Sequence, residues 1–266
     1  MDLGLTGRRA LVTGASEGIG RGVVLALAEE GCDVAFCARR REPLEALATE
    51  VRERFGRRAV PVAADLTRAD DCARAVAEAA AGLGGGLELL VNNAGASVLG
   101  SFDEVDDDAW WGGVELKLHG YVRVTRAALP HLRAAARGSA AVVNIAGNTG
   151  KFPWSQSMSG GAANAAVMNV TVALAQEVAA DGVRVVCLAP GGVDTQRFRM
   201  RVLPAVAAER GITVEEARAT YVASLPLARI ASPEEIGGVV AFLASPRAAN
   251  LTGTTLVYDG GLTSGL

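Results

Sequence analysis

The fold is decided by one stretch near the start of the chain, LVTGASEGIG over Leu11–Gly20. An apolar run leads into three glycines with the spacing of a turn between a strand and a helix. Gly14 permits the tight turn, Gly18 lets the backbone approach a ligand closely, and Gly20 allows the helix to pack on the strand. Because free amides at a helix N-terminus bind phosphate groups, this stretch predicts a dinucleotide site. Its contacts are Gly14, Ser16, Gly18, Ile19 and Gly20.

Strand and helix patterns alternate along the rest of the chain. Short apolar or β-branched runs occur at Ala10–Thr13, Val34–Cys37, Ala59–Ala63, Leu87–Asn92, Ala141–Ile145, Arg184–Ala189 and Thr255–Tyr258. Helix-favouring stretches lie between them at Gly20–Glu30, Pro43–Phe55, Ala69–Ala81, Asp107–Ala135, Gly161–Ala180 and Pro233–Ala244. This alternation predicts an α/β fold, a doubly wound Rossmann-type domain with a parallel seven-stranded sheet and helices on both faces. The length fits a single domain over residues 1–266.

One stretch, residues 191–230, departs from this alternation. It follows the sixth predicted strand, where an open α/β sheet places its ligand crevice. We therefore expect a substrate lid at about 191–230. Within it, Thr213 and Glu216 have the spacing of a capping box at the start of a helix.

Composition argues against several classes of function. A net charge of −3 with scattered arginines provides no basic stripe for a nucleic acid. Neither a signal-peptide core nor a run of about 18 apolar residues is visible, so we expect a cytoplasmic protein without a membrane segment. Cys32, Cys37, Cys72 and Cys187 are too scattered for a disulfide framework or a metal site, and we interpret them as buried apolar residues.

The end of the second predicted strand bears on the choice of cofactor. A site for NAD(H) places a carboxylate there to hold the ribose diol, whereas this chain has Ala38 followed by Arg39, Arg40 and Arg41. The planar fork of an arginine suits a 2′-phosphate, so the sequence favours NADP(H) over NAD(H), with Arg39 as the contact. The alternative is that these arginines belong to a solvated loop.

Further motifs resemble the short-chain dehydrogenase/reductase family over essentially the whole chain. They are Ala64-Asp65-Leu66, Asn92-Asn93-Ala94-Gly95, Pro190-Gly191-Gly192-Val193-Asp194-Thr195 and Asp259-Gly260-Gly261, in addition to the glycine turn. The resemblance implies that Asp65 binds the adenine amine, that Asn92–Gly95 brace the sheet, and that Val193 and Thr195 contact the nicotinamide end. It also implies a homodimer or homotetramer. The cofactor contacts implied in this way are Asp65, Leu66, Asn93, Ala94, Gly95, Pro190, Gly191, Val193 and Thr195.

The catalytic residues of that family are absent. Its members use a serine, a tyrosine with a lysine four residues later, and an asparagine on the preceding helix. The lysine ammonium stabilises the tyrosinate, and the serine polarises the reacting oxygen. In this chain Gly147 stands at the serine position, Gly160 at the tyrosine position, Asn164 at the lysine position and Lys117 at the asparagine position. The chain has only two lysines, Lys117 and Lys151, and no tyrosine lies four residues before either.

Lys117, Ser157 and Asn164 are the candidate replacements. Burial of Lys117 beside a cationic nicotinamide ring could lower its pKa far enough for proton transfer, and the alternative is a structural ion pair. Ser157 and Asn164 could position a ligand but are weak proton donors. Tyr121, one helical turn after Lys117, either shares its face or packs in the core.

Two functions fit these patterns. The first is an NAD(P)(H)-dependent oxidoreductase that acts on a carbonyl, hydroxyl or enone of a small molecule by an atypical proton-transfer arrangement. The second is an NADP(H)-binding protein without redox activity, such as a lyase, an isomerase or a cofactor sensor. The lid arginines Arg197, Arg199 and Arg201 either favour an anionic ligand or are solvated.

Overall fold

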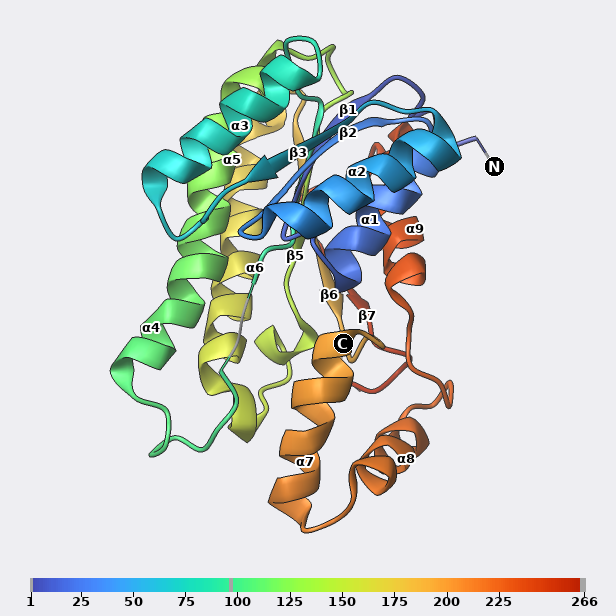
Figure 1. The fold of residues 1–266 in the computed structure, drawn as a ribbon. Helices are drawn as coiled ribbons and strands as arrows, with labels where there is room; N and C mark the ends of the chain where they lie inside the picture. The colour runs from blue at the N-terminus through green and yellow to red at the C-terminus, as the bar shows by residue number, and fades with distance from the viewer. Residues whose placement is uncertain (1, 96–97, 264–266) are drawn as a thin grey trace.

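The computed structural model describes residues 2–95 and 98–263. Its parallel strands form one seven-stranded sheet in the order β3-β2-β1-β4-β5-β6-β7 (Figure 1). The order runs outward from β1 in both directions, which is the doubly wound arrangement, so the predicted fold is confirmed. The strands are β1 Arg9–Thr13, β2 Asp33–Ala38, β3 Ala59–Ala63, β4 Leu89–Asn92, β5 Ala141–Ile145, β6 Arg184–Pro190 and β7 Thr255–Tyr258.

Helices cover both faces of the sheet (Figure 1). They are α1 Gly18–Glu29, α2 Arg41–Phe55, α3 Ala69–Gly82, α4 Asp107–Val114, α5 Gly120–Ala134, α6 Met158–Val178, α7 Leu203–Arg210, α8 Val214–Ser224 and α9 Pro233–Ala244. Buried residues of α1, α2 and α9 form one core with the sheet, and those of α3, α5 and α6 form another. The strands contribute side chains to both cores, because successive side chains of a strand point to opposite faces of the sheet. Val12 of β1 belongs to the first core and Leu11 to the second.

The long helix predicted over Asp107–Ala135 is interrupted. The structure has α4, then a π-helical turn at Glu115–His119, then α5. A π turn inserts one residue into the helix and changes the direction of the side chains around it. The hydrophobic pattern does not reveal so small an insertion, which is why the sequence predicted an unbroken helix. Lys117 lies in the middle of this turn.

The segment predicted as a lid contains two helices, α7 and α8, and they project beyond the sheet (Figure 1). The predicted capping box at Thr213 is present, because its side chain accepts from the Glu216 amide and the Glu216 carboxylate accepts from the Thr213 amide. The Gly192 amide donates to the Tyr221 hydroxyl at 2.8 Å, which ties α8 to the end of β6. The Phe198 and Tyr221 rings pack together with centroids 5.2 Å apart.

Among the described residues, one helical stretch is long and apolar enough to cross a membrane by length and composition alone. It runs over Ser155–Asp181 with a mean hydropathy of 1.2. Sequence patterns had indicated no such stretch, so that expectation was too simple. The stretch contains α6, whose residues Ala175 and Val178 are buried in the second core, and core helices of soluble proteins have the same composition.

Candidate active site

The carboxyl ends of the strands open into a cavity of about 1130 Å³. Residues at the ends of β1, β2, β4, β5 and β6 line it, and its wall continues along the segment that carries α7 and α8. The structure places most of the residues that the sequence singled out around this one cavity, whereas Tyr121, Arg199 and Arg201 are not part of its lining. The lining includes Gly14, Ser16, Gly18, Ile19, Gly20, Arg39, Asp65, Leu66, Asn93, Ala94, Gly95, Lys117, Gly147, Ser157, Gly160, Asn164, Pro190, Gly191, Val193 and Thr195.

The glycine turn has the geometry of a phosphate cradle. Gly14 and Gly18 have φ values of +68° and +57°, a region that L side chains avoid. A Cβ at Gly20 would lie 2.3 Å from the Gly14 carbonyl oxygen, so only glycine permits this approach of α1 to the strand. Glu17 is the N-cap of α1 but its side chain makes no capping hydrogen bond. Glu17 therefore does not occupy the first amides of the helix, and the cradle fits the pyrophosphate of a dinucleotide.

Asn93 braces this turn from the neighbouring strand. Its amide nitrogen Nδ2 donates to the carbonyl oxygens of Thr13 and Gly14 at 2.9 and 3.0 Å. The Thr13 hydroxyl accepts from the backbone amides of Asn93 and Ala94 at 2.9 and 3.1 Å. These bonds join the ends of β1 and β4, which fixes the floor of the site.

A buried polar chain stabilises the sheet behind this floor. Asn92 Nδ2 donates to Thr125 Oγ1 at 2.9 Å and to Asn144 Oδ1 at 2.8 Å. Asn144 Nδ2 donates in turn to Thr171 Oγ1 at 2.9 Å. The chain thus links β4 and β5 to α5 and α6. Sequence patterns indicated the bracing role of Asn92 but gave no signal for Thr125, Asn144 or Thr171, because their partners lie far apart in the sequence.

The opposite end of the site carries the charged groups expected near the adenosine. Arg39 is exposed and makes no ion pair or hydrogen bond with any described residue, whereas Arg40 lies 3.4 Å from the Glu17 carboxylate. Asp65 Oδ1 accepts from the Thr67 amide and hydroxyl at 3.1 and 2.8 Å. Arg39 is therefore available to a ligand, while the charge of Arg40 offsets that of Glu17.

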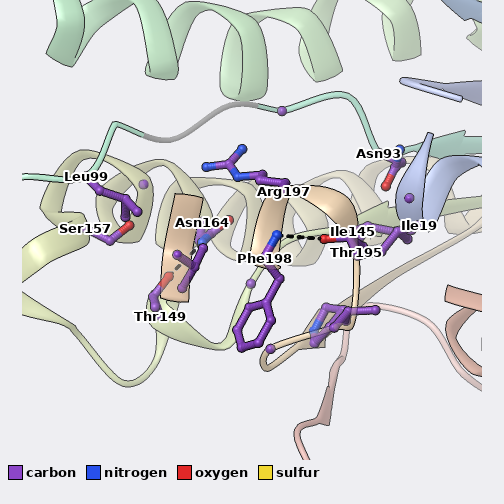
Figure 2. Close-up of a pocket in the computed structure, with 18 of the residues that line it drawn as sticks. Ile19, Asn93, Leu99, Ile145, Thr149, Ser157, Asn164, Thr195, Arg197 and Phe198 are labelled. Carbon is purple, nitrogen blue, oxygen red and sulfur yellow. Dashed lines mark hydrogen bonds between the residues drawn. The ribbon is translucent and has the colours of Figure 1, made fainter. Parts of the chain in front are cut away.

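Asn164 occupies the space left by the missing side chain at position 147. A Cβ at Gly147 would lie 2.8 Å from Asn164 Nδ2. That amide nitrogen donates to Thr149 Oγ1 at 2.9 Å, and Asn164 Oδ1 is buried without a hydrogen-bond partner among the described residues. Ser157 is also buried, and Figure 2 shows Ser157, Thr149 and Asn164 on the same side of the cavity. The Asn164 amide group is therefore held by Thr149, with its carbonyl oxygen buried below the cavity surface.

Lys117 reaches the cavity across Gly95. Its Nζ lies 3.5 Å from the position that a Gly95 Cβ would occupy. Burial is the main reason that the pKa of Lys117 is lowered to about 8; Cys187 opposes the shift and the charge of Arg197 contributes to it. No hydrogen bond or ion pair joins Lys117 to another described residue. Tyr121 lies outside the cavity and donates to the Ile145 carbonyl oxygen at 2.9 Å, which makes it a core residue.

The segment after β6 forms a further wall of the cavity. Val193 forms a β-bridge with Ala231, and the Thr195 hydroxyl accepts from the Phe198 amide at 3.1 Å (Figure 2). A Cβ at Gly18 would lie 3.2 Å from Thr195 Cγ2, so this segment closes against the glycine turn. Arg197 contributes a half-buried guanidinium group to the same wall.

Comparison with known proteins gives consistent matches over the whole chain. A family profile described as short chain dehydrogenase matches residues 8–203. Cis-4-hydroxycyclohexanecarboxylate dehydrogenase of Sinomonas cyclohexanicum is 38% identical over 258 residues, which cover 97% of each protein.

Two solved structures are similar in fold and sequence. L-sorbose reductase from Gluconobacter frateurii, complexed with NADPH and L-sorbose, superposes with a TM-score of 0.92 at 31% identity and full coverage of both chains. An NADPH-bound short chain oxidoreductase from Pseudomonas aeruginosa PAO1, described as containing an atypical catalytic center, superposes with a TM-score of 0.87 at 33% identity. That match covers 98% of this chain and 100% of the other.

Proposed function

The chain belongs to the short-chain dehydrogenase/reductase family of NAD(P)-dependent oxidoreductases, and from this premise we propose that it uses NADP(H) with an atypical proton-transfer group. The reaction is the interconversion of a carbonyl and a hydroxyl group on a small molecule. The observation that supports it most directly is one cavity that contains both the glycine cradle and the Lys117 ammonium. The residues assigned to this site, the segment 191–230 as a lid, and residues 1–266 as one domain are part of the proposal.

The preference for NADP(H) over NAD(H) rests on Arg39. Its guanidinium group is exposed at the end of β2 and lacks an ion-pair partner among the described residues. The carboxylate that would bind a ribose diol and repel a 2′-phosphate is absent at Ala38 and Arg39. The NADPH complexes of similar structures agree with this preference.

The remaining roles in cofactor binding, proton transfer and substrate orientation belong to different residues of the chain. The glycine cradle holds the pyrophosphate, and the nicotinamide supplies or accepts the hydride when the cofactor is bound. In the direction of reduction, Lys117 donates a proton from Nζ to the substrate oxygen as its negative charge develops. In the direction of oxidation the neutral amine accepts that proton. Asn164 and Ser157, which both line the cavity, supply polar contacts that orient the ligand.

A pair of lysine variants tests this assignment. NADPH binding is followed by the fluorescence of the reduced nicotinamide, and turnover is measured on a panel of ketones, enones and alcohols. Lys117→Met should retain NADPH binding and lose about 100-fold or more in kcat, because loss of a general acid typically costs 10²–10⁴-fold. Lys151→Met is the matched control, since Lys151 is exposed and is the only other lysine. Equal kcat values for Lys117→Met and the wild type would refute the role of Lys117.

The second candidate is an NADP(H)-binding protein without redox activity. It is favoured by the four altered positions and by the contact of Asn164 with Gly147, which leaves no room for the usual hydroxyl. NADPH binding without turnover of any panel member would support this candidate over the first. A homodimer or homotetramer in the cytoplasm fits either candidate, and the oligomer is tested by size-exclusion chromatography with light scattering.

A further inference from the structure

Lys117 has the surroundings of a reactive amine. It lines the cavity and lies in the middle of the π turn at Glu115–His119. We propose that Lys117 captures aldehydes and unhindered ketones in this cavity by forming a covalent imine with their carbonyl carbon. The inference goes beyond the proposed function, because this capture needs neither a bound nicotinamide nor a hydride transfer.

The amine of Lys117 is open to the cavity on the side of Gly95. Gly95 follows β4 and is exposed. A Cβ at this position would lie 3.4 Å from Lys117 Cδ and 3.5 Å from Nζ, which is ordinary van der Waals contact. Because residue 95 has no side chain, the space beside Nζ stays uncovered on this side. Both residues line the cavity, so a carbonyl compound can approach Nζ from the direction of Gly95.

No carboxylate holds the Lys117 ammonium in the part of the chain that the structure describes. Glu115, two residues earlier in the same π turn, forms ion pairs with His119 and Arg123 instead. A lysine that is paired with a carboxylate keeps its proton, whereas an unpaired lysine in a desolvated site loses it more easily. The acidic residues of the described cavity lining are Glu17, Asp65 and Glu209, and none of them forms an ion pair with Lys117.

The protonation of Lys117 also favours reaction as an amine. Burial is the main reason that its pKa is lowered to about 8; Cys187 opposes the shift and the charge of Arg197 contributes to it. At pH 7 the neutral amine then makes up about a tenth of Lys117, against about one part in 3000 for a lysine with the ordinary pKa of 10.5. Burial raises the pKa of the Cys187 thiol, so this thiol does not compete as a nucleophile. Desolvated lysines with a lowered pKa are the ones that form Schiff bases in enzymes.

The reaction joins the amine to the carbonyl compound and releases one water. Neutral Nζ attacks the carbonyl carbon, the C–N bond forms as the C=O π bond opens, and a proton passes from the nitrogen to the oxygen through solvent. The resulting carbinolamine loses its hydroxyl group as water and becomes the imine, so nothing is oxidised or reduced. Apolar side chains in the cavity wall suit the organic body of such a compound. They are Leu99, Phe152, Trp154, Phe198, Val202 and Val206, of which Figure 2 labels Leu99 and Phe198.

The experiment traps the imine with sodium cyanoborohydride at about pH 7.5, without any nicotinamide cofactor. Propanal is the probe, and each reduced imine leaves a propyl group that peptide mapping by mass spectrometry assigns to its lysine. Lys151 is the internal reference, because it is exposed and lies outside the cavity lining. Initial alkylation should be about tenfold or more faster at Lys117 than at Lys151, since the larger neutral fraction outweighs the weaker nucleophilicity of a less basic amine.

Two glycine variants locate the reaction. Gly95→Ala places a methyl group beside Nζ and should slow the alkylation of Lys117 several-fold, while the alkylation of Lys151 stays the same. Gly112→Ala is the matched control. Gly112 is exposed on α4 outside the cavity lining, and a Cβ there meets no atom within 4 Å. This control should change the alkylation of neither lysine.

Two results would overturn the inference. One is that Lys117 of the wild type is alkylated no faster than Lys151. The other is that Gly95→Ala and Gly112→Ala have the same effect on the alkylation of Lys117. Binding of NADPH is measured separately, and its failure would contradict the proposed function without changing either of these results.

Discussion

Introducing a side chain at Gly147 should destabilise the protein only while Asn164 is present. Gly147 has φ −149° and ψ 152°, an extended conformation that any residue adopts, so the backbone opposes no substitution. The obstacle is Asn164 Nδ2, which lies 2.8 Å from the position of the new Cβ. To make room, the amide group must rotate away and give up its 2.9 Å hydrogen bond to Thr149.

The magnitude follows from three contributions. Loss of the hydrogen bond costs about 1 kcal/mol, and leaving its buried donor unpaired adds about 1–2 kcal/mol. Replacing glycine by alanine returns about 0.4–1 kcal/mol, because the unfolded chain becomes less flexible. Gly147→Ala should therefore destabilise by about 1–2.6 kcal/mol, which lowers the Tm by about 2–10 °C in a chain of this length. With Asn164→Ala already present, the same change should raise the Tm slightly.

The assay is a double-mutant cycle of thermal unfolding. Wild type, Gly147→Ala, Asn164→Ala and the double variant are melted at one protein concentration, because oligomerisation makes the Tm concentration-dependent. Residues in direct contact should couple, and here we expect about 2 kcal/mol of coupling energy. Equal shifts in Tm for Gly147→Ala in both backgrounds would refute the steric argument. It follows that restoring serine at position 147 alone should not restore the usual catalytic arrangement.

Four further predictions concern the cofactor, the proton-transfer lysine and the lid. Arg39→Ala should weaken NADPH binding by about 10–100-fold and leave NADH binding unchanged. Arg41→Ala, which breaks the exposed ion pair with Glu45, is the control and should change the binding of neither cofactor. Because burial lowers the pKa of Lys117 to about 8, kcat/KM for reduction should fall as the pH rises through 8, and kcat/KM for oxidation should rise. A flat pH profile in both directions would contradict the role of Lys117 as the proton-transfer group. Between pH 8 and 10.5, Lys117 binds more protons in the unfolded chain, where its pKa is the ordinary 10.5, than in the folded protein. The buried charge of Lys117 therefore lowers the stability of the fold below pH 8, and this loss becomes smaller as the pH rises above 8. Lys117→Met should accordingly raise the Tm most below pH 8. Tyr221→Phe removes the acceptor of the Gly192 amide and should lower stability by about 1–3 kcal/mol. Protease digestion should become faster at α7 and α8, while digestion at α1 should stay unchanged as the internal control.

The sequence alone determined the fold and indicated many of the residues that line the cavity beyond the strand ends. Glycines at positions 14, 18 and 20 are required by positive φ values or by close backbone approach, so their spacing carries the three-dimensional constraint directly. The capping box at Thr213 was equally visible, because both of its partners lie within one helical turn. Apolar runs located the strands since a sheet covered on both faces needs apolar side chains in both directions. These features depend on interactions between residues that are close in the sequence, so the sequence pattern is enough to predict them.

The tertiary structure decided the chemistry of the site. Contact between Gly147 and Asn164 joins residues 17 positions apart through a cavity wall, and no periodic pattern records such a contact. The π turn that carries Lys117 is a one-residue insertion within a helix. Lowering of the Lys117 pKa and its coupling to Arg197 depend on desolvation and on distance between groups 80 residues apart in the chain. Positions of charges within a cavity are set by packing, and packing is a property of the folded chain.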